Sequence, residues 1–110
     1  MPFYLALKAE ALYLADRISE ALEVLNEAEA LAERFEQRTF LSGLHRRRGV
    51  FLTALGADRT QIEASFREAI RTAREQKSFS QEKRAEETYA EYRRLKASAS
   101  GGGGIRLPLL

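Results

Sequence analysis

The densest run of side chains that could do chemistry is His45-Arg46-Arg47-Arg48. A histidine that acts as a general base or a metal ligand needs partner groups, and a metal site needs three or four ligands. His45 is the only histidine of the chain, and the chain has no cysteine. We therefore interpret His45 as a structural or surface residue, and we predict no metal and no cofactor.

The acidic residues give no pattern typical of catalysis. Glu86 and Glu87 are adjacent, so on a helix they face different ways, and nothing places two carboxylates across a cleft. No acidic loop has the spacing of a calcium site, and there is no GxxxxGK[ST] phosphate loop. We predict that the chain has no catalytic residues and is not an enzyme.

The arginine run allows two interpretations. Four consecutive residues of a helix point around its whole circumference, so they cannot form one basic patch for nucleic acid. The run can be solvated or paired within the chain. Alternatively, Arg46 and Arg47 line a groove for acidic side chains or a C-terminal carboxylate. We predict a protein or peptide partner and no nucleic acid.

Composition places the chain among soluble helical proteins. Its 110 residues are enough for one domain, with 45% apolar and 31% charged residues. The absence of cysteine favours a reducing, cytoplasmic compartment. No apolar run is long enough to span a membrane, and the apolar start of the chain carries Lys8 and Glu10, which argues against a signal peptide.

Charge is distributed unevenly along the chain. The formal net charge is −5 over residues 1–37, +4 over residues 38–76 and +3 over residues 77–110. Head-to-tail attraction between copies, or a partner of mixed charge, would use this asymmetry. The alternative is that charges have drifted on solvated faces.

Hydrophobic periodicity predicts an all-α chain with about five helices. The expected helices cover approximately residues 3–15, 17–35, 38–55, 61–76 and 79–97. The first is apolar on most sides, which is typical of a buried helix. Ser98–Gly104 has the composition of a flexible linker, and an apolar tail, residues 105–110, follows it.

Residues typical of helix ends mark four of the boundaries. Asp16 can cap the second helix, and Gly56 is expected to end the third. The sequences Thr60–Glu63 and Ser78–Gln81 match capping boxes that would begin the fourth and fifth helices.

A repeat of about 40 residues relates the first two helix pairs. Small residues recur where the two helices of a pair would cross closely, and larger ones fill the space between pairs. The corresponding positions are Ala9 and Gly49, Leu12 and Leu52, Asp16 and Gly56, Ala21 and Ile62, Leu25 and Phe66, and Ala28 and Ala69.

This pattern resembles the tetratricopeptide repeat, with longer helices and without the proline that the family places at the position of Glu33. The resemblance implies antiparallel helix hairpins stacked as a short right-handed solenoid. We expect one domain over residues 1–97, with repeat one at 3–36, repeat two at 38–76 and a capping helix at 78–97. Residues 98–110 follow as linker and tail.

Residues 44–57 and 63–76 have a further resemblance. They look like the C-terminal repeat arrays of bacterial signalling proteins that combine a cyclase or DNA-binding domain with an AAA-like ATPase. The resemblance implies a sensing and docking arm, here without the ATPase.

In the tetratricopeptide class, the first helix of each pair lines the concave surface. Applied to this chain, that rule predicts a partner-binding groove formed by Phe3, Glu10, Tyr13, Arg46, Val50, Thr53, Tyr89 and Tyr92. For the tyrosines, the alternative is a core role in the fifth helix. The apolar tail could lie extended in a groove of its own chain or of a neighbour, or be a disordered end.

Our first functional hypothesis is a protein- or peptide-binding scaffold that uses this concave face. A second is a self-associating structural fragment, a homodimer formed through the apolar open end of so short an array. A third is a regulatory sensing arm of a larger bacterial signalling ATPase.

Overall fold

The computed structural model describes residues 3–36, 38–98 and 105–107 of the chain. Five α-helices and one short 3₁₀ helix account for nearly all of these residues, and the described residues contain no strand. The all-α prediction with five helices is therefore confirmed. The elements are α1 (Phe3–Leu14), α2 (Ile18–Arg34), η1 (Arg38–Phe40), α3 (Leu41–Leu55), α4 (Arg59–Glu75) and α5 (Phe79–Ser98).

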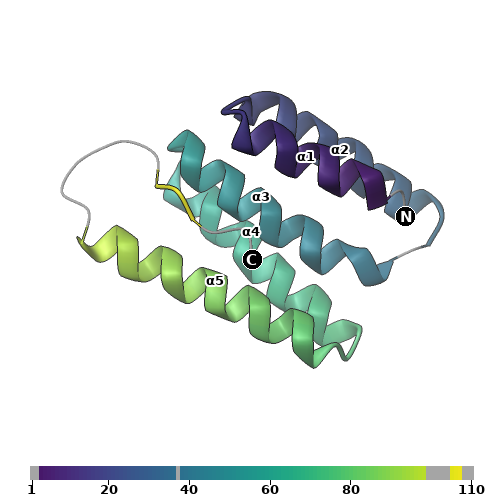
Figure 1. Cartoon of the computed structure of the whole chain (residues 1–110). Helices are drawn as coiled ribbons and strands as arrows, with labels where there is room; N and C mark the ends of the chain where they lie inside the picture. Colours follow the sequence, from purple (N-terminus) through teal and green to yellow (C-terminus); the bar gives the residue numbers. More distant parts are fainter. Residues whose placement is uncertain (1–2, 37, 99–104, 108–110) are drawn as a thin grey trace.

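The helices pack as two pairs and a single last helix (Figure 1). Helix α1 packs on α2, α3 packs on α4, and α2 joins the two pairs by contacting α3. Helix α5 packs against both α4 and α3. Helices α1, α3 and α5 therefore run in the same direction along one side of the molecule, with α2 and α4 behind them (Figure 1).

Small residues let the two helices of each pair approach closely. Ala9 of α1 and Ala28 of α2 are fully buried, as is Ala69 of α4. A Cβ atom added at Gly49 of α3 would lie 2.6 Å from Cε1 of Phe66 on α4, which is closer than packed atoms allow. The Phe66 ring therefore leaves room only for glycine at position 49, as expected where two helices cross closely.

The helices α1 and α3 end in the same way. Asp16 and Gly56 both have a left-handed backbone, with φ of 65° and 77°. The next N–H groups, of Arg17 and Ala57, donate to the carbonyls of Leu12 and Leu52 at 2.8 and 3.0 Å. This bond across the last turn is the Schellman arrangement. The prediction that Gly56 ends a helix is confirmed, and Asp16 takes the equivalent position.

The other predicted caps are wrong. Asp16 does not cap α2, whose N-cap position is Arg17 and has no side-chain cap. Helix α4 begins at Arg59, so Thr60 lies inside it, and Glu63 accepts hydrogen bonds from Arg59 and Tyr89 instead of reaching back. Glu63 therefore pairs with Arg59, four residues earlier, and with Tyr89 of the last helix, and it does not cap the start of α4.

The second predicted capping box also differs. The Nε2 group of Gln81 donates to the carbonyl of Thr39 at 3.1 Å, so this side chain links α5 to η1. Helix α5 extends through Ser98, which was expected to begin the linker. Residues 38–40, expected to open the third helix, form η1.

Helix α1 is only partly buried, although its sequence is apolar on most sides. Leu5, Ala6, Ala9 and Tyr13 face the core, whereas Tyr4, Leu7 and Leu14 are more than half exposed. Helix α1 packs mainly against α2, so no described element covers the side that carries the exposed residues.

Part of the uneven charge along the sequence is paired within the chain. Arg47 of α3 donates from Nε to Glu10 of α1 at 2.7 Å, and Arg48 donates from Nη2 to Glu29 of α2 at 2.7 Å. The acidic first pair is thus held to the basic third helix by partly buried pairs. This supports intramolecular pairing as one use of the arginine run.

Candidate functional site

The side of the molecule formed by α1, α3 and α5 carries the candidate site, and we call it the α1–α3–α5 face. Stacked aromatic rings support it from below. Tyr13 of α1 stacks on Phe51 of α3 with ring centroids 4.8 Å apart. Tyr89 of α5 stacks on Phe66 of α4 at 5.4 Å. One stack joins α1 to α3 and the other joins α5 to α4, so each links helices from different parts of the sequence.

An extended segment of the chain itself, residues 105–107, lies on one end of this face. The N–H of Ile105 donates to the carbonyl of Thr53 at 3.1 Å, and the Tyr13 hydroxyl donates to the carbonyl of Leu107 at 3.3 Å. The Leu107 side chain is only 3% exposed and belongs to the main hydrophobic core. Residues 105–107 therefore lie extended against their own chain, which was one of the alternatives, and we call this the occupied end.

Arg106 strengthens the docking of the same segment. Its guanidinium lies over the Tyr13 ring, 4.9 Å from the centroid, and donates to the Asp16 carboxylate and to the Tyr13 carbonyl. The pKa of Arg106 is raised, mainly by its bond to Tyr13. Apolar burial, main-chain hydrogen bonds and a cation–π contact thus act together over three residues.

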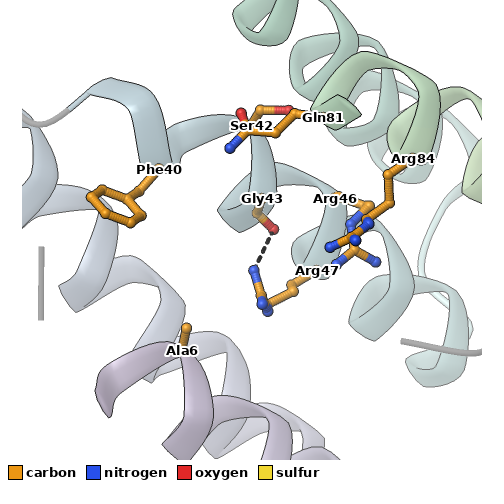
Figure 2. Close-up of a pocket in the computed structure, with 8 residues that line it drawn as sticks. All are labelled: Ala6, Phe40, Ser42, Gly43, Arg46, Arg47, Gln81 and Arg84. Carbon is orange, nitrogen blue, oxygen red and sulfur yellow. Dashed lines mark hydrogen bonds between the residues drawn. The ribbon is translucent and has the colours of Figure 1, made fainter. Parts of the chain in front are cut away.

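At the other end of the face lies a cavity of about 210 Å³. We call it the arginine cavity. Ala6 of α1 and Phe40 of η1 form part of its wall, together with residues of α3 and α5 (Figure 2). Its remaining described lining residues are Ser42, Gly43, Arg46, Arg47, Gln81 and Arg84.

Three guanidinium groups line this cavity, and none of its described lining residues is acidic. The side chains of Arg46 and Arg84 converge from α3 and α5 (Figure 2). Arg46 is 3% exposed, and burial, helped by the nearby charges of Arg47 and Arg84, lowers its pKa to about 10. Arg46 remains charged at neutral pH, so the cavity concentrates positive charge in a partly desolvated place.

Several lining groups are already engaged, among them Arg47, Ser42 and the Nε2 group of Gln81. Arg47 donates from Nη1 to the Gly43 carbonyl at 3.1 Å and from Nε to Glu10, so one guanidinium of the cluster already holds a carboxylate. Ser42 donates to the Ala69 carbonyl at 2.8 Å. In contrast, the Oε1 atom of Gln81 is buried and has no partner among the described residues.

Most of the predicted groove residues have side chains that are buried and not exposed. Val50 is fully buried, Thr53 is 2% exposed and donates to the Gly49 carbonyl, and Tyr92 is 1% exposed. The prediction that they line an open groove is corrected, because α3 and α5 pack closely enough to bury them. Of Phe3, only the backbone is described, and it begins α1.

The remaining predicted residues have distinct places. Tyr13 contacts the docked segment, Arg46 lines the arginine cavity, and Glu10 holds Arg47 at the edge of the cavity. Tyr89 donates to Glu63, and this bond is the largest cause of the lowered pKa of Glu63. Tyr89 and Tyr92 therefore act as core contacts of α5, which was the alternative interpretation.

Sequence reasoning missed Arg84 and Gln81, and it left open whether the apolar tail docks on its own chain. Arg84 lies among the many charges of α5, and only the packing of α5 on α3 brings it to Arg46. Gln81 was interpreted as a local cap. The segment 105–107 was recognised as apolar, but a glycine-rich stretch carries no signal for where the chain returns.

Two observations concern the whole described part of the chain. None of its helices combines the length and apolar character needed to cross a membrane. Within the same residues, no three histidine or acidic side chains gather as they would around a metal ion.

Comparison with known proteins gives one relative. No family model matches the chain, and no solved structure matches it. Over 91 residues, 83% of its length, the chain is 32% identical to an uncharacterized protein of Rhizobium meliloti (strain 1021). The aligned region makes up 9% of that protein, so the chain spans less than a tenth of the relative's length.

Proposed function

We propose that this chain is a protein- or peptide-binding module whose α1–α3–α5 face takes an extended segment of its partner. The single observation that carries the proposal is the docking of residues 105–107, which bury Leu107 and pair two main-chain groups with Tyr13 and Thr53. A surface that accepts one extended peptide through its main chain can accept others with similar side chains. The tethered segment then acts as an internal competitor.

The finer fold that we propose is a short right-handed solenoid of the tetratricopeptide type. Two features support it: the matching left-handed ends at Asp16 and Gly56, and the fully buried small residues at both crossings. In this arrangement the α1–α3–α5 face is the concave surface, which repeat proteins of this architecture use for binding.

The test compares the whole chain with a variant that loosens the docked segment, Leu107→Asn. A fluorescently labelled peptide with the sequence of residues 105–110 serves as probe, and anisotropy measures its binding. Because a competitor tethered to the same chain acts at a millimolar effective concentration, we expect weak binding to the unchanged chain and at least tenfold tighter binding to Leu107→Asn.

The matched control is Leu14→Asn, the same change at a leucine that is 76% exposed. It should bind the probe as weakly as the unchanged chain. Helicity by circular dichroism should be the same for all three proteins. Equal binding by Leu107→Asn and Leu14→Asn would contradict the proposal.

A second candidate function is a sensing and docking arm within a larger bacterial signalling protein in the cytoplasm. The relative favours it, since a 91-residue match that makes up 9% of that protein implies a length of about 1,000 residues. Domains encoded next to the matching region would test this candidate: an adjacent ATPase or cyclase would support it, and their absence would count against it.

Self-association is the third candidate, and the exposed side of α1 favours it. Tyr4, Leu7 and Leu14 are 65%, 51% and 76% exposed and lie on one stripe of the helix. Sedimentation of the whole chain at micromolar concentration tests it. A dimer that Leu7→Asp converts to monomer would support this candidate, and a clean monomer would exclude it.

A further inference from the structure

Another cavity lies where the start of α4 meets the end of α5, and we call it the α4–α5 cavity. The two helices run in opposite directions, since Arg74 near the end of α4 pairs with Glu82 near the start of α5. The volume of the cavity is about 340 Å³. Its described lining residues are Arg59 of α4 and Tyr92, Arg93, Lys96 and Ala97 of α5. Neither Tyr13 nor Thr53 is among them, so this cavity is separate from the occupied end.

Positive charge gathers around the α4–α5 cavity. Arg59 donates from Nε to the carboxylate of Glu63 at 2.5 Å, so its charge is balanced. Arg93 lies over the Tyr89 ring, 4.4 Å from the centroid, and neither Arg93 nor Lys96 forms an ion pair with another described residue. None of the described lining residues is acidic. The charges of Arg93 and Lys96 therefore remain available to an anion.

Tyr92 is the buried member among the described lining residues. It is 1% exposed, and its hydroxyl is buried without a hydrogen-bond partner among the described residues. Its ring lies against Phe66, with ring centroids 5.8 Å apart, which holds it in place. Burial raises the pKa of Tyr92, so the hydroxyl keeps its proton at neutral pH and can donate. Most buried hydroxyls have an acceptor, and within the described residues this one lacks it.

The start of α4 adds main-chain donors. Helix α4 begins at Arg59, and Asp58 at its N-cap position makes no side-chain cap bond within the described residues. The N–H groups of a first helical turn have no acceptor inside the helix, and together with the helix dipole they favour an anion. Among biological anions, a phosphate group has a charge of about −2 at neutral pH and offers three terminal oxygens to donors from several directions.

From these observations we infer that the α4–α5 cavity binds a phosphate group. Arg93 and Lys96 supply positive charge, and Tyr92 supplies the buried hydroxyl. Because the lining cations are exposed, they can change rotamer as the ligand enters and let it reach that hydroxyl. The group comes from free phosphate and its small esters or from a phosphorylated side chain, which present the same oxygens. The inference is independent of the proposed peptide-binding face, so either can fail without the other.

NMR of the isotope-labelled whole chain tests the inference by titration with sodium phosphate at neutral pH and constant ionic strength. We expect saturable shifts of the amide signals of Arg59, Arg93 and Lys96, with a dissociation constant in the millimolar range. A second titration uses a short peptide of glycine and phosphoserine. Tighter binding of this peptide assigns the site to phosphorylated side chains, and binding no tighter than that of phosphate assigns it to free phosphate and its small esters.

Two variants each remove one group of the cavity, and a third is the matched control. Tyr92→Phe removes only the hydroxyl and should weaken phosphate binding about tenfold, as expected for one hydrogen bond to a charged group. Arg93→Gln should weaken binding by a similar factor. Arg94→Gln removes the same charge from the neighbouring exposed arginine, which lies outside the cavity, and should leave binding unchanged.

Circular dichroism establishes that each variant has the helicity of the unchanged chain. Arg93 is exposed, so Arg93→Gln tests the site even where a change at buried Tyr92 disturbs the fold. The inference is overturned if phosphate causes no saturable shifts at the cavity, or if a folded Tyr92→Phe binds phosphate as tightly as the unchanged chain. Equal weakening by Arg93→Gln and Arg94→Gln would also overturn it, because that result indicates a general response to charge.

Discussion

The two ends of the α1–α3–α5 face are built from the same helices but offer different surfaces. At the occupied end, Tyr13 presents a ring and a hydroxyl, Thr53 presents a backbone carbonyl, and an extended segment covers them. At the arginine cavity, two turns away, charged side chains surround an empty volume of about 210 Å³. One face thus has an apolar end and a basic end.

The two ends differ because the same helices carry different kinds of residue at different positions along their length. Around Tyr13 and Thr53 the first and third helices carry apolar or small residues, whereas α3 carries the basic run in its middle. Helix α5 closes the basic end because it packs on α3 there, bringing Gln81 and Arg84 to the cavity.

The largest expected effect comes from Gly49, which lies between the two ends on α3. A methyl group at this position would meet the Phe66 ring at 2.6 Å, so Gly49→Ala must push α3 away from α4. We expect a loss of about 1–3 kcal/mol in the free energy of unfolding, measured by urea denaturation. Both ends should be disturbed, because the helix that joins them moves.

Gly43→Ala is the matched control in the same helix. Its nearest neighbour would be Nη1 of Arg47, the end of a flexible side chain, at 3.0 Å. Alanine favours a helix over glycine by about 1 kcal/mol, so this variant should be as stable as the unchanged chain or more stable. Similar losses for the two variants would show that helix propensity and not the crossing sets the cost.

Two tyrosines of α5 give an intermediate effect and test how that helix is held. The Tyr89 hydroxyl donates to Glu63, whereas the Tyr92 hydroxyl is buried without a partner among the described residues. Tyr89→Phe should therefore cost about 1–2 kcal/mol, and Tyr92→Phe should be neutral or slightly stabilising. Thermal unfolding of both variants checks this, and an equal cost for the two would contradict the assignment.

The smallest expected effect is on the pH dependence of stability. It comes from His45 on α3 and not from the α1–α3–α5 face. Burial lowers the pKa of His45, outweighing the nearby carboxylates of Glu29 and Glu68. The unfolded chain therefore binds the proton more readily than the folded chain does. Stability from neutral His45 is complete above about pH 6.5 and falls as pH drops through the lower folded pKa.

Melting temperatures between pH 7.5 and 5.5 measure this effect. The decline across that range should be smaller in His45→Gln than in the unchanged chain. Peptide affinity should stay constant between pH 7 and 8, because the pKa of Arg46, about 10, lies well above that range. An unchanged decline in His45→Gln would show that His45 is not the group responsible.

The helices were predictable because their signals are local. Periodicity placed five helices, Gly56 marked an end, and the correspondence of Ala9 with Gly49 located two crossings that are buried. The predicted capping box at Thr60–Glu63 failed because Glu63 has stronger partners in Arg59 and Tyr89. A local motif cannot reveal a competitor that packing brings from another helix.

The candidate site was only partly predictable for the same reason. Arg46 and Tyr13 were found because they lie on the first helices of the pairs. Arg84 was missed because the sequence does not show which of the charged residues of α5 faces α3. Docking of residues 105–107 on their own chain stayed one of several alternatives, because their contacts span more than 50 residues of sequence and follow a stretch whose sequence is compatible with many paths.

The most direct test of the central claim is hydrogen exchange at the Ile105 amide, followed by NMR in the whole chain with and without the peptide that has the sequence of residues 105–110. Because this N–H donates to Thr53, it should be protected in the free chain and should lose its protection when saturating peptide displaces the segment. Protection that is absent in the free chain, or that persists at saturating peptide, would contradict the account.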